Sequence, residues 1–157
     1  MPYMTSPIDD ARLFYRDYRP ASSPAPFQPL VEGGQDVSLI FIHGWPMSSA
    51  MWEYFMLPLC ESHRIRCVAM DRRGFGKSEW SGTPHSSTAE VDYNTFSKDT
   101  MHLLEELDLK KIIFVASSNM GCGESLLAYF GSKWARERCR VCIAKAVWQH
   151  SRRKCDC

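Results

Sequence analysis

Long hydrophobic segments are missing from this sequence of 157 residues. The longest apolar run, around Leu39–Ile42, is far shorter than the roughly 20 residues that a membrane-spanning helix needs. The residues up to Arg12 contain the acidic pair Asp9–Asp10 and no apolar core, so they do not match a signal peptide. From these two absences we expect a cytoplasmic protein without a membrane partner.

An excess of one charge is also missing, because 19 Lys and Arg face 18 Asp and Glu and the net charge is +1. Charge alone therefore does not predict nucleic-acid binding. Residues 133–157 are nevertheless basic, with eight cationic and two anionic side chains. Such runs mostly form solvated surface. We predict a domain over residues 1–148 and a basic, disordered tail over residues 149–157, with no nucleic-acid partner.

A full set of disulfides is not expected, because the number of cysteines, seven, is odd. Cys139, Cys142, Cys155 and Cys157, with His150 between them, have the spacing of metal ligands. However, Cys142 belongs to an apolar strand pattern, and the last two cysteines lie where chain ends fray. We therefore predict no bound metal, and a structural zinc site is the alternative.

What the sequence does have is the composition of a globular domain, with 45% apolar and 24% charged residues. Short apolar runs alternate with helical patterns. The predicted strands are Arg12–Tyr18, Val37–Ile42, Arg66–Met70, Lys111–Ala116 and residues 140–148. The predicted helices cover residues 48–59, 95–107 and 123–134. This alternation indicates an α/β fold, with a mostly parallel sheet that begins with antiparallel strands and carries helices on both faces.

Three polar loops follow three of these strands. They read His43-Gly44-Trp45-Pro46, then Asp-Arg-Arg-Gly-Phe-Gly-Lys-Ser over 71–78, then Ser-Ser-Asn-Met-Gly-Cys-Gly-Glu over 117–124. Reactive loops lie at the carboxyl ends of parallel strands. Neither of the two glycine-rich loops is a nucleotide site, because positions 71 and 126 hold Asp and Leu where the phosphate-binding motifs need Gly.

These three loops, in this order and spacing, resemble the α/β-hydrolase superfamily, especially its cofactor-free haloperoxidases and related esterases. The likeness extends from about Arg12 to Trp148. It implies an α/β-hydrolase fold, a small-molecule ester or acyl substrate, and no cofactor, metal or haem. It also implies a Ser, Asp or Glu, and His triad, with peracid formation as a side reaction.

The third loop resembles the nucleophile elbow of this superfamily, a sharp bend from strand to helix with small residues on both sides of the nucleophile. Ser117 and Gly121 are the small flanking residues, which places Asn119 at the position of the nucleophile. The resemblance implies that the backbone N–H groups of Met120 and Trp45 form the oxyanion hole.

Asn119 departs from the superfamily, because an amide has no hydroxyl with which to form an acyl-enzyme. Ser118 is a substitute nucleophile one residue earlier. Its use would place the bulky Met120 where a small residue is required, so we favour ordinary turn and capping roles for Ser117 and Ser118. The resemblance gives His43 the role of shaping the oxyanion loop.

The other two triad members normally follow the nucleophile along the chain. After Asn119 the sequence offers Glu124, Glu137, Asp156 and His150. We expect the two glutamates to be helix-surface charges, and His150 follows too early a strand. We therefore interpret the chain as a partial domain without the last strands, the catalytic acid, the catalytic histidine or a lid, and expect it to be catalytically impaired.

A non-catalytic pseudoenzyme or interaction module is the alternative hypothesis. The sheet would then end at an unpaired strand near Val141–Trp148. Such edges invite pairing with another chain, so this hypothesis includes self-association through the exposed sheet edge.

Overall fold

A computed structural model describes residues 2–21, 37–81, 93–109 and 111–118, together with Gly121 and Lys133. The strands are β1 (Tyr3–Thr5), β2 (Arg12–Tyr18), β3 (Val37–Ile42), β4 (Arg66–Met70) and β5 (Lys111–Ala116). The helices are the 3₁₀ helix η2 (Ser49–Trp52), α1 (Glu53–His63) and α2 (Tyr93–Glu106). Apart from Lys133, which is helical, the helix predicted at 123–134 lies outside the described residues, as do the strand predicted at 140–148 and the predicted tail.

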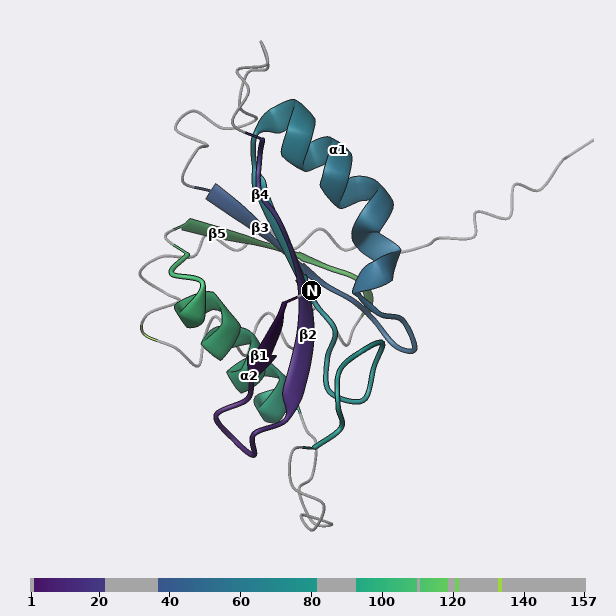
Figure 1. The fold of residues 1–157 in the computed structure, drawn as a ribbon. Coiled ribbons are helices and arrows are strands. Elements are labelled where there is room, and N and C mark those ends of the chain that lie inside the picture. Colours follow the sequence, from purple (N-terminus) through teal and green to yellow (C-terminus); the bar gives the residue numbers. More distant parts are fainter. Residues whose placement is uncertain are drawn as a thin grey trace, which may run out of the picture.

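The five strands form one sheet in the order β1-β2-β4-β3-β5 (Figure 1). β3 pairs in parallel with β4 and β5, and β1 and β2 add antiparallel strands at one edge. This confirms the predicted parallel centre with an antiparallel beginning. Four strands, β2 to β5, have the bounds predicted from the sequence. Short continuous apolar runs suit strands that are covered on both faces.

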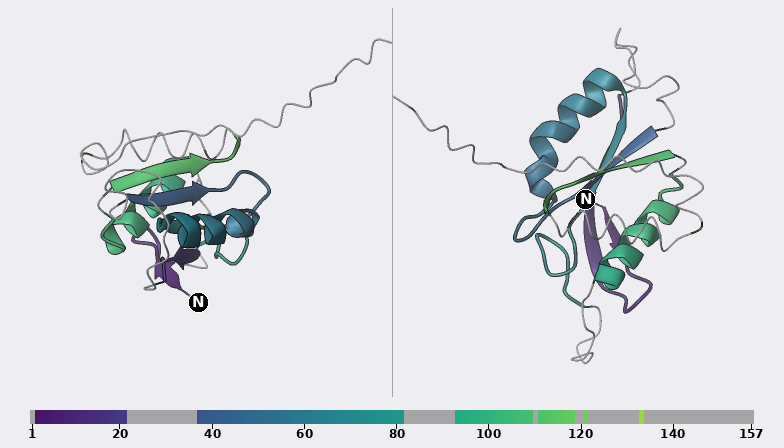
Figure 2. Two further views of the ribbon diagram at one scale, coloured as in Figure 1. Left: turned by 90° about the horizontal axis from the view of Figure 1, so that it is seen from above. Right: turned by 180° about the vertical axis from the view of Figure 1, so that it is seen from behind.

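The two long helices cover opposite faces of the sheet (Figure 2). α2 places Leu103 and Leu104 in a cluster with alternate strand residues, including Ile40, Val68 and Phe114. α1 and η2 place Trp52 and Met56 in a second cluster with the intervening strand residues, including Phe41. The period of two along each strand thus divides its apolar residues between two cores.

The first predicted helix was too short at its carboxyl end. Ser48 caps η2 by accepting a hydrogen bond from the Ala50 N–H, and α1 then continues past Pro58 to His63. Proline removes one helical hydrogen bond. Met56 and Cys60, which lie four residues apart on either side of Pro58, are both buried where α1 continues. Phe55 lies off this stripe and is 61% exposed.

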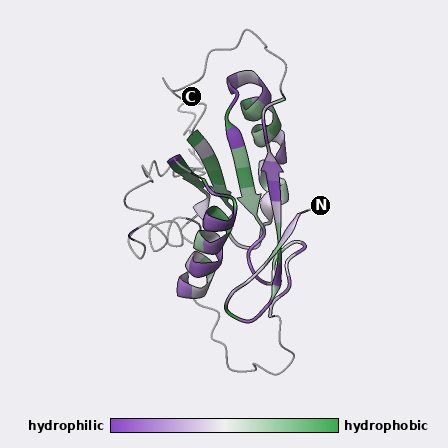
Figure 3. Cartoon of the chain, turned by 60° about the vertical axis from the view of Figure 1, so that its left-hand side comes forward, coloured by the Kyte–Doolittle hydropathy of each residue, from purple (hydrophilic) through white to green (hydrophobic). Residues whose placement is uncertain are grey.

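α2 begins two residues earlier and ends one residue earlier than predicted. Its buried side carries Phe96 and the two leucines, but also the polar residues Ser97, Asp99 and Thr100. Figure 3 shows the hydrophilic residues distributed along α2 beside the mostly hydrophobic central strands. Of these polar residues, Asp99 connects α2 to the loops described below, whereas the Ser97 hydroxyl donates to the Asn94 carbonyl within the helix. None of the described helices is long and apolar enough to cross a bilayer.

Candidate functional site

The three loops identified in the sequence begin at the same edge of the sheet. Ile42, the last residue of β3, is in register with Met70 of β4 and with Ala116 of β5. The Ser117 N–H extends this pairing by donating a hydrogen bond to the Ile42 carbonyl at 3.0 Å. Because parallel strands bring their carboxyl ends together, residues from 43, 71 and 117 onward are neighbours in space.

His43 joins the first two loops. Its side chain is fully buried; Nε2 accepts a hydrogen bond from the Arg72 N–H at 3.1 Å, and Nδ1 lies 2.9 Å from the Gly44 carbonyl. These partners assign the proton to Nδ1, which donates to the carbonyl. Burial lowers the pKa of His43, so the ring is neutral at pH 7. This arrangement agrees with the loop-shaping role implied by the resemblance.

Asp71 organises the second loop from within. Its carboxylate accepts hydrogen bonds from the Ser49 N–H at 2.6 Å and the Lys77 N–H at 2.8 Å. Gly76 has a left-handed backbone with φ of 56°, and a Cβ there would overlap the Asp71 carboxylate. The turn therefore requires glycine, both for its backbone and for space. Asp71 is buried and has a structural role that ties the loop to the start of η2.

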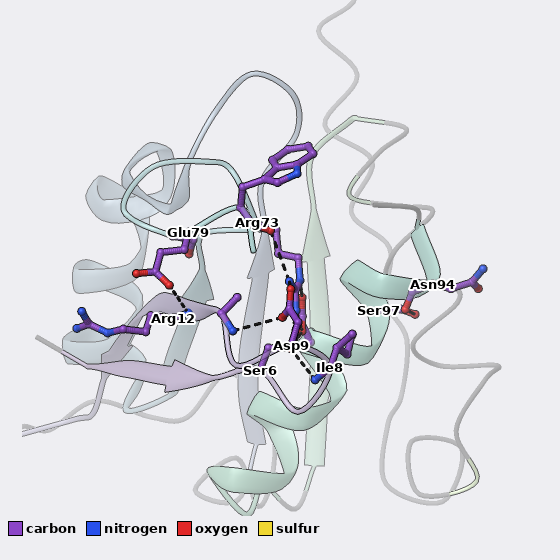
Figure 4. A network of polar contacts seen from close by, with 12 residues as sticks. Ser6, Ile8, Asp9, Arg12, Arg73, Glu79, Asn94 and Ser97 are labelled. Carbon is purple, nitrogen blue, oxygen red and sulfur yellow. Dashed lines mark hydrogen bonds and ion pairs between the residues drawn. The ribbon is translucent and has the colours of Figure 1, made fainter. Parts of the chain in front are cut away.

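Arg73 holds a buried network between the second loop, the β1–β2 turn and α2 (Figure 4). Its guanidinium donates to the carboxylate of Asp99 on α2 and, at 2.7 Å, to Asp9. Ser6 accepts from the same guanidinium and donates to Asp99 at 2.6 Å. The exposed fractions of the Arg73 and Asp99 side chains are 2% and 1%, so this ion pair is shielded from water.

The charge of Arg73 is secured by its partners. Burial by itself would lower the pKa of the guanidinium, but hydrogen bonds and charges from Asp9 and Asp99 outweigh it and raise the pKa. The network explains why α2 buries Asp99. Sequence analysis missed it, although polar residues within the apolar stripe of a helix are a usable signal.

The third loop starts with a sharp bend. Ser118, two residues after β5, has a left-handed backbone with φ of 63° and an exposed side chain. Gly121 is buried, and a Cβ there would lie 3.1 Å from the Ile42 carbonyl oxygen and 3.4 Å from Ala116 Cβ. A small residue at position 121 is therefore needed beside the end of the sheet.

The predicted site residues are only partly within the described chain. Asn119, at the predicted nucleophile position, and Met120, a predicted oxyanion donor, lie outside the described residues. Trp45 follows Gly44 in the first loop, and its side chain is 68% exposed. Of the predicted set, the structure thus describes Trp45 and Ser118. Gly44 and Ser118 approach closely, because a Cβ on Gly44 would lie 2.9 Å from Ser118 Cβ.

A cleft of about 420 Å³ adjoins the first loop. Its lining is mostly apolar and comprises Pro46, Met47, Ser48, Ala50, Met51 and Gly76. Within the ranges that the structure describes, no three His, Cys, Asp or Glu side chains gather as a metal site. The cysteines of the alternative zinc site lie outside those ranges.

Comparison with protein families decides the affiliation of the chain. The model of the family described as "alpha/beta hydrolase fold" matches residues 37–139, which include all three loops. The chain belongs to this family. The resemblance seen in the loops is thereby confirmed.

Two members of the α/β-hydrolase family resemble the chain over most of its length. It is 34% identical over 133 residues to the non-heme chloroperoxidase CPO-A1 of Kitasatospora aureofaciens, covering 83% of this chain and 38% of that protein. It is 31% identical over 149 residues to the bifunctional esterase/perhydrolase DCH of Acinetobacter calcoaceticus, covering 94% of this chain and 43% of that protein.

Among solved α/β-hydrolase structures, the bromoperoxidase from Bacillus anthracis superposes with a TM-score of 0.64 at 28% identity. The match covers 90% of this chain and 43% of the bromoperoxidase. The chain therefore spans less than half the length of these relatives.

Proposed function

We propose that this chain binds small carboxylic esters at the three-loop edge of its sheet but is impaired in hydrolysing them. The observation that carries the proposal is the close approach of Gly44, in the first loop, to Ser118, at the bend after β5. This contact brings the neighbourhood of the Trp45 N–H, a candidate oxyanion donor, to the bend where the family places its nucleophile.

The impairment follows from the residue at position 119. A carboxamide cannot lose a proton to a neighbouring base and attack a carbonyl, so Asn119 does not support an acyl-enzyme.

The cleft beside the first loop favours an apolar substrate. Met47 and Met51 contribute flexible thioether side chains to its lining, and such side chains adapt to varied apolar shapes. One relative, the esterase/perhydrolase DCH of Acinetobacter calcoaceticus, supports an ester or another small acyl compound as the ligand class.

The experiment compares the parent with Asn119→Ser. Both are incubated with an activated acetate ester and with a fluorophosphonate probe, and Asn94→Ser on α2 is the matched control. We expect no turnover by the parent above that of buffer without protein, and covalent labelling of residue 119 in Asn119→Ser but no added label in Asn94→Ser. Multiple turnovers by the parent would contradict the proposed impairment. Silence of Asn119→Ser towards both reagents would contradict an ester site.

A non-catalytic interaction module is the second candidate, and the outward face of α1 favours it. Tyr54, Phe55 and Leu57 are 89%, 61% and 52% exposed. We propose a second copy of the chain as the occupant of this exposed apolar face of α1.

Light scattering tests this second candidate. A concentration-dependent dimer that Leu57→Glu abolishes would support it, with Glu105→Gln on α2 as the control. A monomer at all concentrations would contradict it.

A further inference from the structure

Two methionines line the cleft beside the first loop. Met47 lies in the turn that follows Trp45, where its backbone N–H donates a hydrogen bond to the Gly44 carbonyl at 2.9 Å. Met51 follows four residues later in η2, and both residues contribute to the lining of the cleft of about 420 Å³. The cleft that we assign to an apolar ligand is therefore partly walled by thioethers.

Asp71 holds the walls of this cleft together. Its carboxylate accepts a hydrogen bond from the Ser49 N–H, in the segment that carries both methionines. It also accepts one from the Lys77 N–H, next to Gly76, which lines the cleft as well. Because one buried carboxylate joins the two segments, the cleft is formed before any ligand arrives.

The methionines of the cleft differ from those of the core in their access to solvent. Met47 is 47% exposed, whereas Met4, Met56 and Met70 are buried. Met51 is partly buried, because it also packs against the apolar cluster between α1 and the sheet. Oxidants dissolved in water reach an accessible thioether before a buried one, so these residues differ in their susceptibility to oxidation.

We propose that Met47 is a site of oxidation by peroxides and that its sulfoxide closes the cleft to apolar ligands. The closure rests on the proposed function, because it concerns the same cleft. A lone pair of the Met47 sulfur attacks one oxygen of hydrogen peroxide and forms an S–O bond, while the O–O bond breaks. The proton of the transferred oxygen passes to the departing hydroxide, which leaves as water. The sulfur is oxidised by two electrons and the peroxide is reduced.

Oxidation exchanges a flexible apolar side chain for a polar sulfoxide. An apolar ligand in the cleft would displace water from the sulfoxide oxygen and offer it no hydrogen bond in return. The neighbouring side chains of Pro46, Ala50 and Met51 have no polar hydrogen that replaces this water. We therefore expect the dissociation constant of an apolar ligand to rise about tenfold.

The first measurement is peptide mapping of the parent after exposure to dilute hydrogen peroxide. We expect the sulfoxide to form first on Met47 and later on Met51. Met4, Met56 and Met70 should be oxidised only in denaturant. Equal rates of oxidation at Met47 and Met56 in the folded chain would overturn the inference, because access through the cleft would then select neither residue.

The second measurement is titration with the neutral fluorophore N-phenyl-1-naphthylamine before and after the exposure that oxidises Met47. The dissociation constant of the parent should rise about tenfold, and methionine sulfoxide reductases should reverse the change. Peroxide should not change the affinity of Met47→Leu from its value before treatment. Met101→Leu on α2 is the matched control and should respond to peroxide as the parent does.

The outcomes separate this inference from the proposed function. An untreated parent that does not bind the fluorophore would contradict the apolar cleft itself and, with it, the closure. Binding that survives complete oxidation of Met47 would contradict the closure and leave the proposed function standing. Leu57→Glu, on the outward face of α1, should bind the fluorophore as the parent does. Loss of binding in Leu57→Glu would place the fluorophore on α1 and overturn its assignment to the cleft.

Discussion

The backbone N–H of Arg72 donates a hydrogen bond to His43 Nε2 across 3.1 Å, which joins the loops after β4 and β3. The ring also packs edge-on against Phe75, with 5.4 Å between the ring centroids. A histidine at this position therefore satisfies a buried donor from the neighbouring loop. Its contribution is to hold two loops in register at the edge where we place the ester site.

His43→Ala should lower the free energy of unfolding by about 2–4 kcal/mol, because it leaves a cavity and a buried Arg72 N–H without an acceptor. Urea unfolding followed by circular dichroism measures this loss. His102→Ala on the surface of α2, where His102 lies 3.9 Å from Glu106, is the control and should stay within about 0.5 kcal/mol of the parent. Equal effects of the two changes would contradict the role given to His43.

The same histidine makes stability depend on pH. Burial lowers its pKa in the folded chain below the ordinary value of 6.5. Above pH 6.5 both states are neutral and the stability is complete. As the pH falls below 6.5, the histidine becomes protonated in the unfolded state but stays neutral in the folded state. The free energy of unfolding therefore falls by at most about 1.4 kcal/mol per pH unit. Urea curves at several pH values should show this slope, and His43→Ala should have less of it.

Asp71→Ala should be destabilising by about 2–4 kcal/mol, because the Ser49 and Lys77 N–H groups lose the carboxylate that accepts both. Asp71→Asn keeps one acceptor oxygen and should lose less. Chemical denaturation ranks the two variants, with Glu105→Gln on exposed α2 surface as a control for charge. If Asp71→Asn were as damaging as Asp71→Ala, charge rather than hydrogen bonding would hold the loop.

Arg73→Met should cost about 3–5 kcal/mol, because it leaves the buried carboxylate of Asp99 without its partner. Arg73→Met combined with Asp99→Asn should cost less than the sum of the single changes. A double-mutant cycle measures this coupling. The half-exposed pair Arg16–Glu53, with 3.3 Å between its atoms, is the control cycle and should give less than about 1 kcal/mol. Equal coupling in both cycles would contradict the importance of burial.

Cys60 and Cys67 should resist alkylation in the folded chain. Both thiols are fully buried, and burial raises their pKa values to about 11 and about 12. The thiolate is the reactive form, so little of it exists near pH 8. Iodoacetamide labelling with peptide mapping should modify both residues in denaturant and neither without it. Rapid labelling in buffer would show that α1 opens away from β4.

The sequence predicts the strands well and the helix ends less well. β2 to β5 are continuous or alternating apolar runs, and their bounds agree with the prediction. Pro58 did not end α1, because Met56 and Cys60 bury the helix on both sides of it. Local propensity is a weak guide wherever an apolar stripe continues past an unfavourable residue.

The sequence by itself determined the α/β class, the three loops and their common edge, because alternating apolar periods record which residues are buried. It did not determine their partners. Only the tertiary structure decided that β3 lies between β4 and β5, that Arg73 meets Asp99, and that Gly44 meets Ser118. The periodicity of apolar residues indicates which residues are buried. These contacts depend on the strand order and on the path of the chain between strands, which no local pattern encodes.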